Sequence, residues 1–305
     1  MTGWPAPSFR RCLAPRAVVA LGACTLLAGC GGILNPQGPV ASAQLIILMD
    51  ALVIMLAIVV PTMIATLVFA WWFRASNARA TYRPSFAYSG RIEILVWSIP
   101  ILVIMFLGGV IWVGSHDLDP FKPLPTKGNP VEVQVVALDW KWLFIYPEQG
   151  VASVNQLVVP AGVPVHFTMT GASVFNTFFI PQLGGMIYVM NGMVTQLHLQ
   201  ADRIGDYYGR SGHFSGDGFP EMQFTVHAVL QPDFDDWVAK TRGGGPRLDE
   251  AAYQQLEKQG VTPQPVTYGA VDPVLFHRIA TQRIPPAPGP NLEAESAAVH
   301  PRAEK

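Results

Sequence analysis

Residues 51–73, ALVIMLAIVVPTMIATLVFAWWF, contain no charged side chain, and residues 94–113, ILVWSIPILVIMFLGGVIWV, contain none either. Each run reaches the roughly 20 apolar residues that a helix needs to cross about 30 Å of hydrocarbon. Pro61 and Pro100 lie within these runs, and a membrane helix tolerates proline where neighbouring groups satisfy the freed carbonyl. The sequence therefore predicts a transmembrane hairpin over residues 44–115.

The loop between the two runs, residues 74–91, is basic. It contains four arginines and no acidic residue, whereas residues 31–49 contain no Lys or Arg. Short cytoplasmic loops carry an excess of Lys and Arg, so we expect this loop in the cytoplasm and both ends of the hairpin outside. The net charge of −1 and the lack of a basic stripe with interleaved aromatics give no indication of nucleic-acid binding.

The N-terminus is typical of an export signal. Arginines precede the apolar stretch 17–27, and all three cysteines of the chain lie in its first 30 residues: Cys12, Cys24 and Cys30. The run Leu-Ala-Gly-Cys at 27–30 resembles the lipobox of bacterial lipoproteins, which implies removal of residues 1–29 and a lipid on Cys30. The alternative is an uncleaved hydrophobic N-terminus with an incidental cysteine. Residues 30–43 form a short outer segment before the hairpin, and no downstream thiol is available for a disulfide.

After a linker at 116–130, the pattern changes to the period of two that is typical of strands. Short β-rich runs separated by Gly, Pro and Asn predict an antiparallel sandwich or barrel over residues 131–230, with the topology left open. The expected strands are 131–135, 156–159, 163–169, 174–180, 195–199 and 222–229.

The region 231–285 is expected to be a helical extension. Asp233 or Asp235 is a candidate N-cap for a first helix, Leu248–Lys258 is the second, and Asp272-Pro273 is a typical start for a third. The composition of residues 286–305, rich in Pro, Ala and charged side chains, predicts a disordered tail. The predicted fold class is thus a membrane α + β protein, with a helical hairpin, a β domain and short C-terminal helices.

Two segments of the β domain carry a resemblance to a known family. These are LDWKW at 138–142 and YGRSGHFSGDGFPEM at 208–222, and they are similar to subunit II of the haem-copper terminal oxidases. The resemblance covers roughly residues 40–280 and implies a two-helix hairpin followed by a periplasmic, cupredoxin-like sandwich. In the cytochrome c branch, this domain holds a dinuclear copper centre built from an upstream His and a loop of the form Cys-x-Glu-x-Cys-x-x-x-His-x-x-Met.

The chain keeps this frame but lacks the copper ligands. Asn176 stands at the upstream His position, the Cys, Glu, Cys and His positions hold Ser211, His213, Ser215 and Phe219, and only Met222 is retained. Bridging thiolates are soft ligands that a serine hydroxyl does not replace. We therefore expect no metal and no cofactor in this chain. A stray metal site formed by His213 with His227 is the alternative.

A subunit II that keeps the spacing of the copper-binding motif but lacks the copper ligands is characteristic of the quinol branch of the family. Residues 91–106, RIEILVWSIPILVIMF, and 176–193, NTFFIPQLGGMIYVMNGM, resemble subunit II of bo-type ubiquinol oxidases. This resemblance implies a supporting subunit of a proton-translocating enzyme in the bacterial inner membrane, which oxidises ubiquinol without cytochrome c and reduces oxygen to water. Haem, copper and the main chemistry are then expected in subunit I, with further small membrane subunits as partners.

Three residues need a more specific interpretation. In the family, a glutamate at the place of Glu93 lies at the mouth of a proton-uptake pathway, which makes Glu93 a candidate for proton entry; the alternative is an interfacial ion pair with Arg91. Trp140 and Trp142 are two residues apart, so a strand places them on one side. Without copper we expect them to pack in the domain core or on subunit I, and not to relay electrons.

Two other functions are compatible with parts of the pattern. One is a copper-bearing subunit II that carries electrons, against which the missing thiolates argue. The other is a lipoprotein that uses a cupredoxin-like sandwich as a scaffold outside any oxidase.

Overall fold

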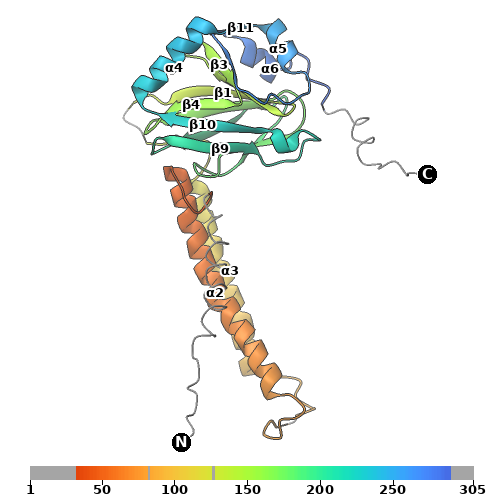
Figure 1. Cartoon of the computed structure of the whole chain (residues 1–305). Helices are drawn as coiled ribbons and strands as arrows, with labels where there is room; N and C mark the ends of the chain where they lie inside the picture. The colour runs from red at the N-terminus through yellow and green to blue at the C-terminus, as the bar shows by residue number, and fades with distance from the viewer. Residues whose placement is uncertain (1–31, 82, 126–127, 290–305) are drawn as a thin grey trace, which may run out of the picture.

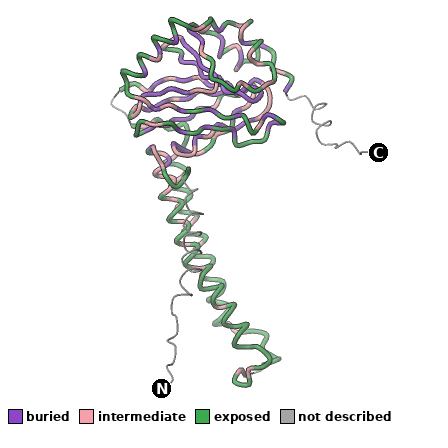
Figure 2. The backbone as a smooth tube through the Cα atoms, in the orientation of Figure 1, coloured by how far each residue is buried: buried purple, intermediate pink, exposed green. Residues whose placement is uncertain are grey.

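The computed structural model describes residues 32–81, 83–125 and 128–289, and it consists of a long helical hairpin below a β domain (Figure 1). Helix α2 spans Pro39–Trp72 with 34 residues, and α3 spans Gly90–Asp117 with 28 residues. At 1.5 Å per residue they are about 51 and 42 Å long, more than the roughly 30 Å of a bilayer core. Both are long and apolar enough to cross a membrane, and their side chains are mostly exposed (Figure 2).

The β domain is a sandwich of two mixed sheets. One sheet has six strands in the order β12-β3-β2-β1-β5-β8, and the other has five in the order β4-β10-β9-β6-β7. The strands are β1 Val131–Leu138, β2 Lys141–Tyr146, β3 Val151–Val154, β4 Gln156–Pro160, β5 Pro164–Gly171, β6 Asn176–Phe179, β7 Ile187–Val189, β8 Thr195–Gln200, β9 Gly205–Ser211, β10 Gln223–Val229 and β12 Val266–Tyr268.

The main core lies between the two sheets and is rich in aromatic side chains. Phe178 and Phe224 are parallel with ring centroids 5.2 Å apart, and Trp142 contacts both with its edge. A second core covers the outer face of β1, β2 and β3 with helices of the C-terminal region. Because β2 is covered on both faces, all six of its residues are buried.

The C-terminal region contains both helices and strands. It consists of α4 Gln231–Gly244, β11 Arg247–Leu248, α5 Glu250–Leu256, β12 Val266–Tyr268, β13 Ala270–Val271 and α6 Leu275–Ala280. The β-branched and aromatic residues of β12 pair antiparallel with β3 and extend the large sheet. The expected helices are present, and the structure has three short strands between them in addition.

The predicted fold class is confirmed, and the structure refines its details. The β domain was expected to be antiparallel, but β1 pairs with β5 and β10 with β4 in parallel. Neither Asp233 nor Asp235 is an N-cap, because α4 begins earlier, with Pro232 in its first turn. The α5 cap is Asp249, whose Oδ1 accepts a hydrogen bond of 2.9 Å from the Ala252 amide. The hairpin helices extend beyond the predicted 44–115 at both ends.

The start of the hairpin is joined to the β domain by backbone hydrogen bonds. The Gln37 amide donates to the Gln182 carbonyl at 2.8 Å, and the Gln37 carbonyl accepts from the Asp202 amide at 2.8 Å. Gly38 follows at the start of α2, where a Cβ atom would lie 2.1 Å from the carbonyl oxygen of Gln200. Only glycine therefore permits this close approach of the two backbones.

Candidate functional site

The positions of the absent copper ligands lie together at one end of the five-stranded sheet. Asn176 begins β6 and Ser211 ends β9, and both are buried. The Ser211 hydroxyl donates to Oδ1 of Asn176 at 3.0 Å, and the Ser211 amide donates to the Met222 carbonyl at 3.1 Å. The structure thus brings together residues that are 35 positions apart in the sequence.

The loop from Gly212 to Met222 closes the other side of this site. The Ser215 hydroxyl lies 3.8 Å from Sδ of Met222 in a buried contact. The Ser215 carbonyl accepts a hydrogen bond of 2.9 Å from Nε1 of Trp140. Gly218 lies against the indole of Trp140, at a distance that leaves no room for a Cβ atom. Trp140 therefore anchors the loop to the turn between β1 and β2.

The donor atoms of the site are neutral and engaged with one another. The side chains present an amide, two hydroxyls and one thioether, from Asn176, Ser211, Ser215 and Met222. Of these only the thioether is a soft ligand, and a dinuclear copper centre requires thiolates. The arrangement is suited to holding the loop in place through short neutral contacts.

The side chains at the two remaining positions make aromatic contacts. His213 is exposed and contacts the ring of Phe175, with centroids 4.5 Å apart, and Phe219 contacts Phe214 at 5.6 Å. Nδ1 of His227 lies 2.6 Å from Oδ1 of Asp206 on the neighbouring strand. Within the described residues, no three His, Cys, Asp or Glu side chains are arranged around a possible metal ion.

Trp140 and Trp142 differ in backbone conformation although both belong to the main core. Trp142 lies in β2 and is fully buried, whereas Trp140 occupies the β1–β2 turn with φ of 67°. Strand alternation was therefore the wrong reason for expecting them on one side, because the turn at Asp139-Trp140 precedes β2. A tryptophan rarely adopts positive φ, and here the hydrogen bond to the loop holds it there.

A buried polar group next to this turn was not foreseen from the sequence. Nζ of Lys141 donates to the carbonyls of Leu256 and Lys258, both at 2.7 Å, and so joins β2 to the end of α5. Burial lowers the pKa of Lys141, although Asp139 opposes that shift. Burial likewise raises the pKa of Asp139, while a hydrogen bond from Ser173 and the charge of Lys141 counteract the rise. The sequence feature that could have indicated this buried contact is a lysine, Lys141, within an otherwise apolar run of strand residues.

Glu93 lies in the first turn of α3, at the end of the hairpin far from the β domain (Figure 1). Its side chain is exposed in this single chain, and Oε2 accepts a hydrogen bond of 3.1 Å from Nε1 of Trp97. Within the described residues, Arg91 makes no ion pair with it. Cys30, the proposed signal at 1–29 and residues 290–305 lie outside the described residues.

Comparison with known proteins identifies the family of the chain. Residues 132–229 match the family described as cytochrome c oxidase subunit II, periplasmic domain, and residues 242–286 match the COX aromatic rich motif. The chain is 46% identical to ubiquinol oxidase subunit 2 of Acetobacter aceti, over 86% of each chain. It is 47% identical to cytochrome bo(3) ubiquinol oxidase subunit 2 of Pseudomonas putida, over 83% of this chain and 81% of that one.

A more distant relative has the same kind of name. Quinol oxidase subunit 2 of Bacillus cereus is 36% identical over 77% of this chain and 82% of its own length. The alternative of a scaffold outside any oxidase is not favoured by these relatives. With its apolar hairpin, its cupredoxin-like sandwich and these similarities, the chain belongs to the ubiquinol oxidase subunit 2 family, within the subunit II proteins of the haem-copper oxidases.

Proposed function

We propose that this chain is the non-redox subunit II of a proton-translocating oxidase that oxidises ubiquinol and reduces oxygen to water. Its partners are subunit I, which holds the haem and copper and performs the main chemistry, and further small membrane subunits. The observation that carries this proposal is the neutral, self-bonded cluster of Asn176, Ser211, Ser215 and Met222 at the copper position. Ubiquinol is soluble in the membrane and reaches subunit I without a copper relay or cytochrome c.

The copper content of the full chain tests the non-redox role. We expect the chain, purified separately in detergent and incubated with copper, to retain no dinuclear centre by elemental analysis and electron paramagnetic resonance. Two copper ions per chain with the signal of a mixed-valence thiolate centre would overturn the proposal. In the assembled complex we expect oxidation of ubiquinol that added cytochrome c neither replaces nor stimulates.

We also propose a location in the bacterial inner membrane, with the β domain in the periplasm and the loop between α2 and α3 in the cytoplasm. The four arginines of residues 74–91 support this orientation. A lipid on Cys30 adds a second anchor on the periplasmic side. Intact-mass analysis of the mature chain tests the anchor: we expect an N-terminus at Cys30 with added acyl mass, and an unmodified Met1 contradicts it.

Glu93 is the residue that we propose for proton entry into subunit I. It is at the cytoplasmic end of α3 in the proposed orientation, and an ionisable group at a membrane span is a functional candidate. In the assembled oxidase, Glu93→Ala is expected to slow turnover and proton uptake together. Trp97→Phe removes the hydrogen bond to Glu93 but keeps the carboxylate, so this control should retain both rates. Unchanged turnover and proton uptake in Glu93→Ala would refute the role.

A further inference from the structure

Two cavities meet where α3 ends and the linker to the β domain begins. The linker cavity, of about 540 Å³, lies between the linker, the start of α2 and the edge of the six-stranded sheet. The hairpin groove, of about 630 Å³, lies between α2 and α3. Asp117 and Leu118 line both. Small-molecule sites have volumes of roughly 300–1,000 Å³, so each cavity is large enough to hold one part of a ligand.

The hairpin groove is apolar and about as deep as one leaflet of a membrane. Apart from Asp117, its walls are apolar side chains and glycines, among them Ile46 of α2 and Met105 and Phe106 of α3. From Met105 to Asp117, α3 rises about 18 Å, whereas half of a bilayer core is about 15 Å thick. The groove is open at Gly109, because no atom outside its own helix backbone lies within 4 Å of the place that a Cβ atom would take. An acyl chain of one leaflet fits this depth, and a helix that spans both leaflets does not.

The linker cavity lies at the level of the lipid headgroups. Trp112 of α3 is exposed, and tryptophan is enriched at membrane–water interfaces. Asp117 follows about 7.5 Å further along the helix, toward the β domain. Asp117, Asp119 and Lys122 line the cavity. Nζ of Lys122 is 3.9 Å from Oδ1 of Asp117, a long ion pair in which both side chains are more than half exposed. The cavity therefore offers an ammonium group together with an excess of negative charge.

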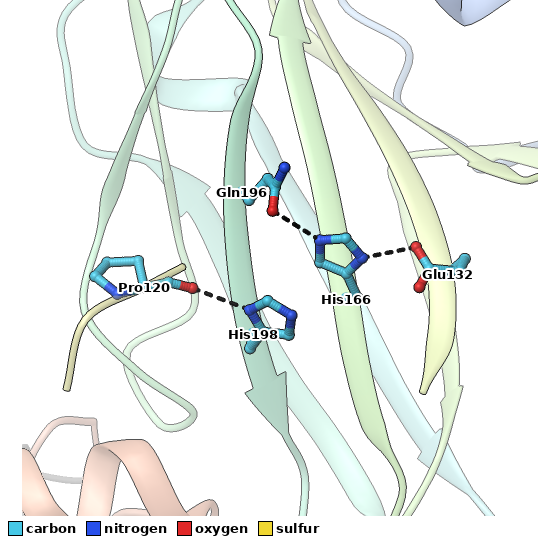
Figure 3. Close-up of polar contacts among 5 residues, drawn as sticks. All are labelled: Pro120, Glu132, His166, Gln196 and His198. Atoms are coloured by element: carbon cyan, nitrogen blue, oxygen red, sulfur yellow. Dashed lines mark hydrogen bonds and ion pairs between the residues drawn. The ribbon is translucent and has the colours of Figure 1, made fainter. Parts of the chain in front are cut away.

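The linker wall of this cavity is fixed to the large sheet by a row of side chains (Figure 3). Nδ1 of His198 on β8 lies 3.1 Å from the carbonyl oxygen of Pro120. The ring of His198 stacks on that of His166 on β5, 8° from parallel and with centroids 4.4 Å apart. Nδ1 of His166 in turn lies 2.8 Å from Oε2 of Glu132 on β1. These contacts hold Pro120, and with it the neighbouring Asp119, so the cavity is formed before a ligand binds and less conformational entropy is lost on binding.

We propose that the two cavities together bind one molecule of phosphatidylethanolamine, with an acyl chain in the hairpin groove and the headgroup in the linker cavity. The lipid ammonium pairs with Asp117 and Asp119 and the phosphate with Lys122, which replaces the long ion pair by shorter charge-assisted contacts. A primary ammonium donates three hydrogen bonds, whereas the methylated ammonium of phosphatidylcholine donates none. Phosphatidylglycerol brings a net negative charge to a cavity with two carboxylates, which repel it. The bound lipid joins the hairpin to the linker at the membrane surface.

Native mass spectrometry of the full chain in detergent, titrated with lipids of identical acyl chains, tests the site. The wild type should bind one phosphatidylethanolamine about tenfold more tightly than phosphatidylcholine or phosphatidylglycerol, the factor expected for a hydrogen bond to a charged group. Gly109→Leu fills the groove and should abolish this tight binding. Gly108→Leu is the matched control and should bind as the wild type does, because a Cβ atom there is equally free of neighbours but Gly108 does not line the groove.

Neutral side chains in the linker cavity test the headgroup contacts separately. Asp117→Asn/Asp119→Asn should bind phosphatidylethanolamine no more tightly than phosphatidylcholine. Asp233→Asn/Asp236→Asn removes two exposed carboxylates of α4 and should keep the tenfold preference.

Three results would overturn the proposal. They are equal affinity of the wild type for the three lipids, equal binding by Gly109→Leu and the wild type, and an equal loss of binding in Gly108→Leu. If circular dichroism shows that Gly109→Leu does not fold, the lipid preference of the wild type and of the two aspartate variants decides.

Discussion

Replacement of Gly218 by alanine tests the role of Trp140 as the anchor of the Gly212–Met222 loop. A Cβ atom on Gly218 would lie 2.2 Å from Cδ2 of Trp140 and 2.3 Å from Cε3. Gly218 has φ of −87° and ψ of 9°, a backbone conformation that alanine also adopts. The substitution therefore tests the steric clash with Trp140 and not backbone strain. To reach an ordinary contact the indole must move by more than about 1 Å, which breaks its hydrogen bond to the Ser215 carbonyl.

The expected cost combines two effects. Overpacking costs about 1–3 kcal/mol, and a buried indole N–H without its partner costs about 1–3 kcal/mol. The same displacement of the indole relieves the overpacking and breaks the hydrogen bond, so the two costs are not fully additive and we expect about 2–4 kcal/mol in total. This free energy corresponds to a change of about thirtyfold to nine-hundredfold in the equilibrium constant for local opening of the loop. Hydrogen exchange of the Phe219 and Met222 amides, which donate within the loop, measures this constant.

Gly243→Ala is the control for this experiment. Gly243 lies in α4, and no atom outside its own helix backbone lies within 4 Å of the place that a Cβ atom would take. Alanine should therefore leave the loop unchanged and slightly stabilise the helix. If Gly218→Ala leaves the exchange of the loop amides as slow as in the wild type, Trp140 is not the anchor and the reasoning is wrong.

Two further predictions concern the contact between β2 and α5. Lys141→Met leaves two carbonyls at the end of α5 without their charged donor, so we expect about 2 kcal/mol less local stability, measured as faster amide exchange in α5. The control is Lys122→Met at an exposed lysine, which should leave this exchange unchanged. Equal amide exchange of α5 in the two variants would contradict the prediction. Burial and the charge of Asp139 raise the pKa of Glu257, so its folded state holds a proton that the unfolded state has released. Stability should therefore fall as pH rises from about 4 through the folded pKa of Glu257. The measurement is the fall of the melting temperature with rising pH, which Glu257→Gln should reduce. Glu221→Gln, at an exposed glutamate, should leave this pH dependence unchanged. An unchanged pH dependence in Glu257→Gln would contradict the prediction.

The hairpin and six of the thirteen strands in the described residues, β1, β4, β5, β6, β8 and β10, were predictable because their signals are local. A charge-free run of helical length and a period of two depend only on neighbouring residues. Strand β2 was missed because a strand covered on both faces lacks alternation, and its second cover comes from helices more than 100 residues later. The positive φ of Trp140 was not predictable from neighbouring residues either, because it depends on a hydrogen bond to Ser215, 75 positions away.

The candidate site was predictable in its parts but not in its contacts. Family spacing placed Asn176, Ser211 and Ser215 at one centre, and the structure brings these side chains together with Met222. The pairing of His166 with His198 depends on the register of β5 and β8, which a single sequence does not specify.

The backbone bonds between the start of the hairpin and the β domain also have a consequence for biogenesis. Gln37 leaves the ribosome about 145 residues before its partner Gln182 and about 165 before Asp202. In the orientation proposed above, the hairpin enters the membrane while the start of α2 still lacks its partners, and the partner loops must first cross the membrane. Closure of such distant contacts is slow, so docking of the domain onto its own anchor is expected to be a late step of maturation, after both helices are in place.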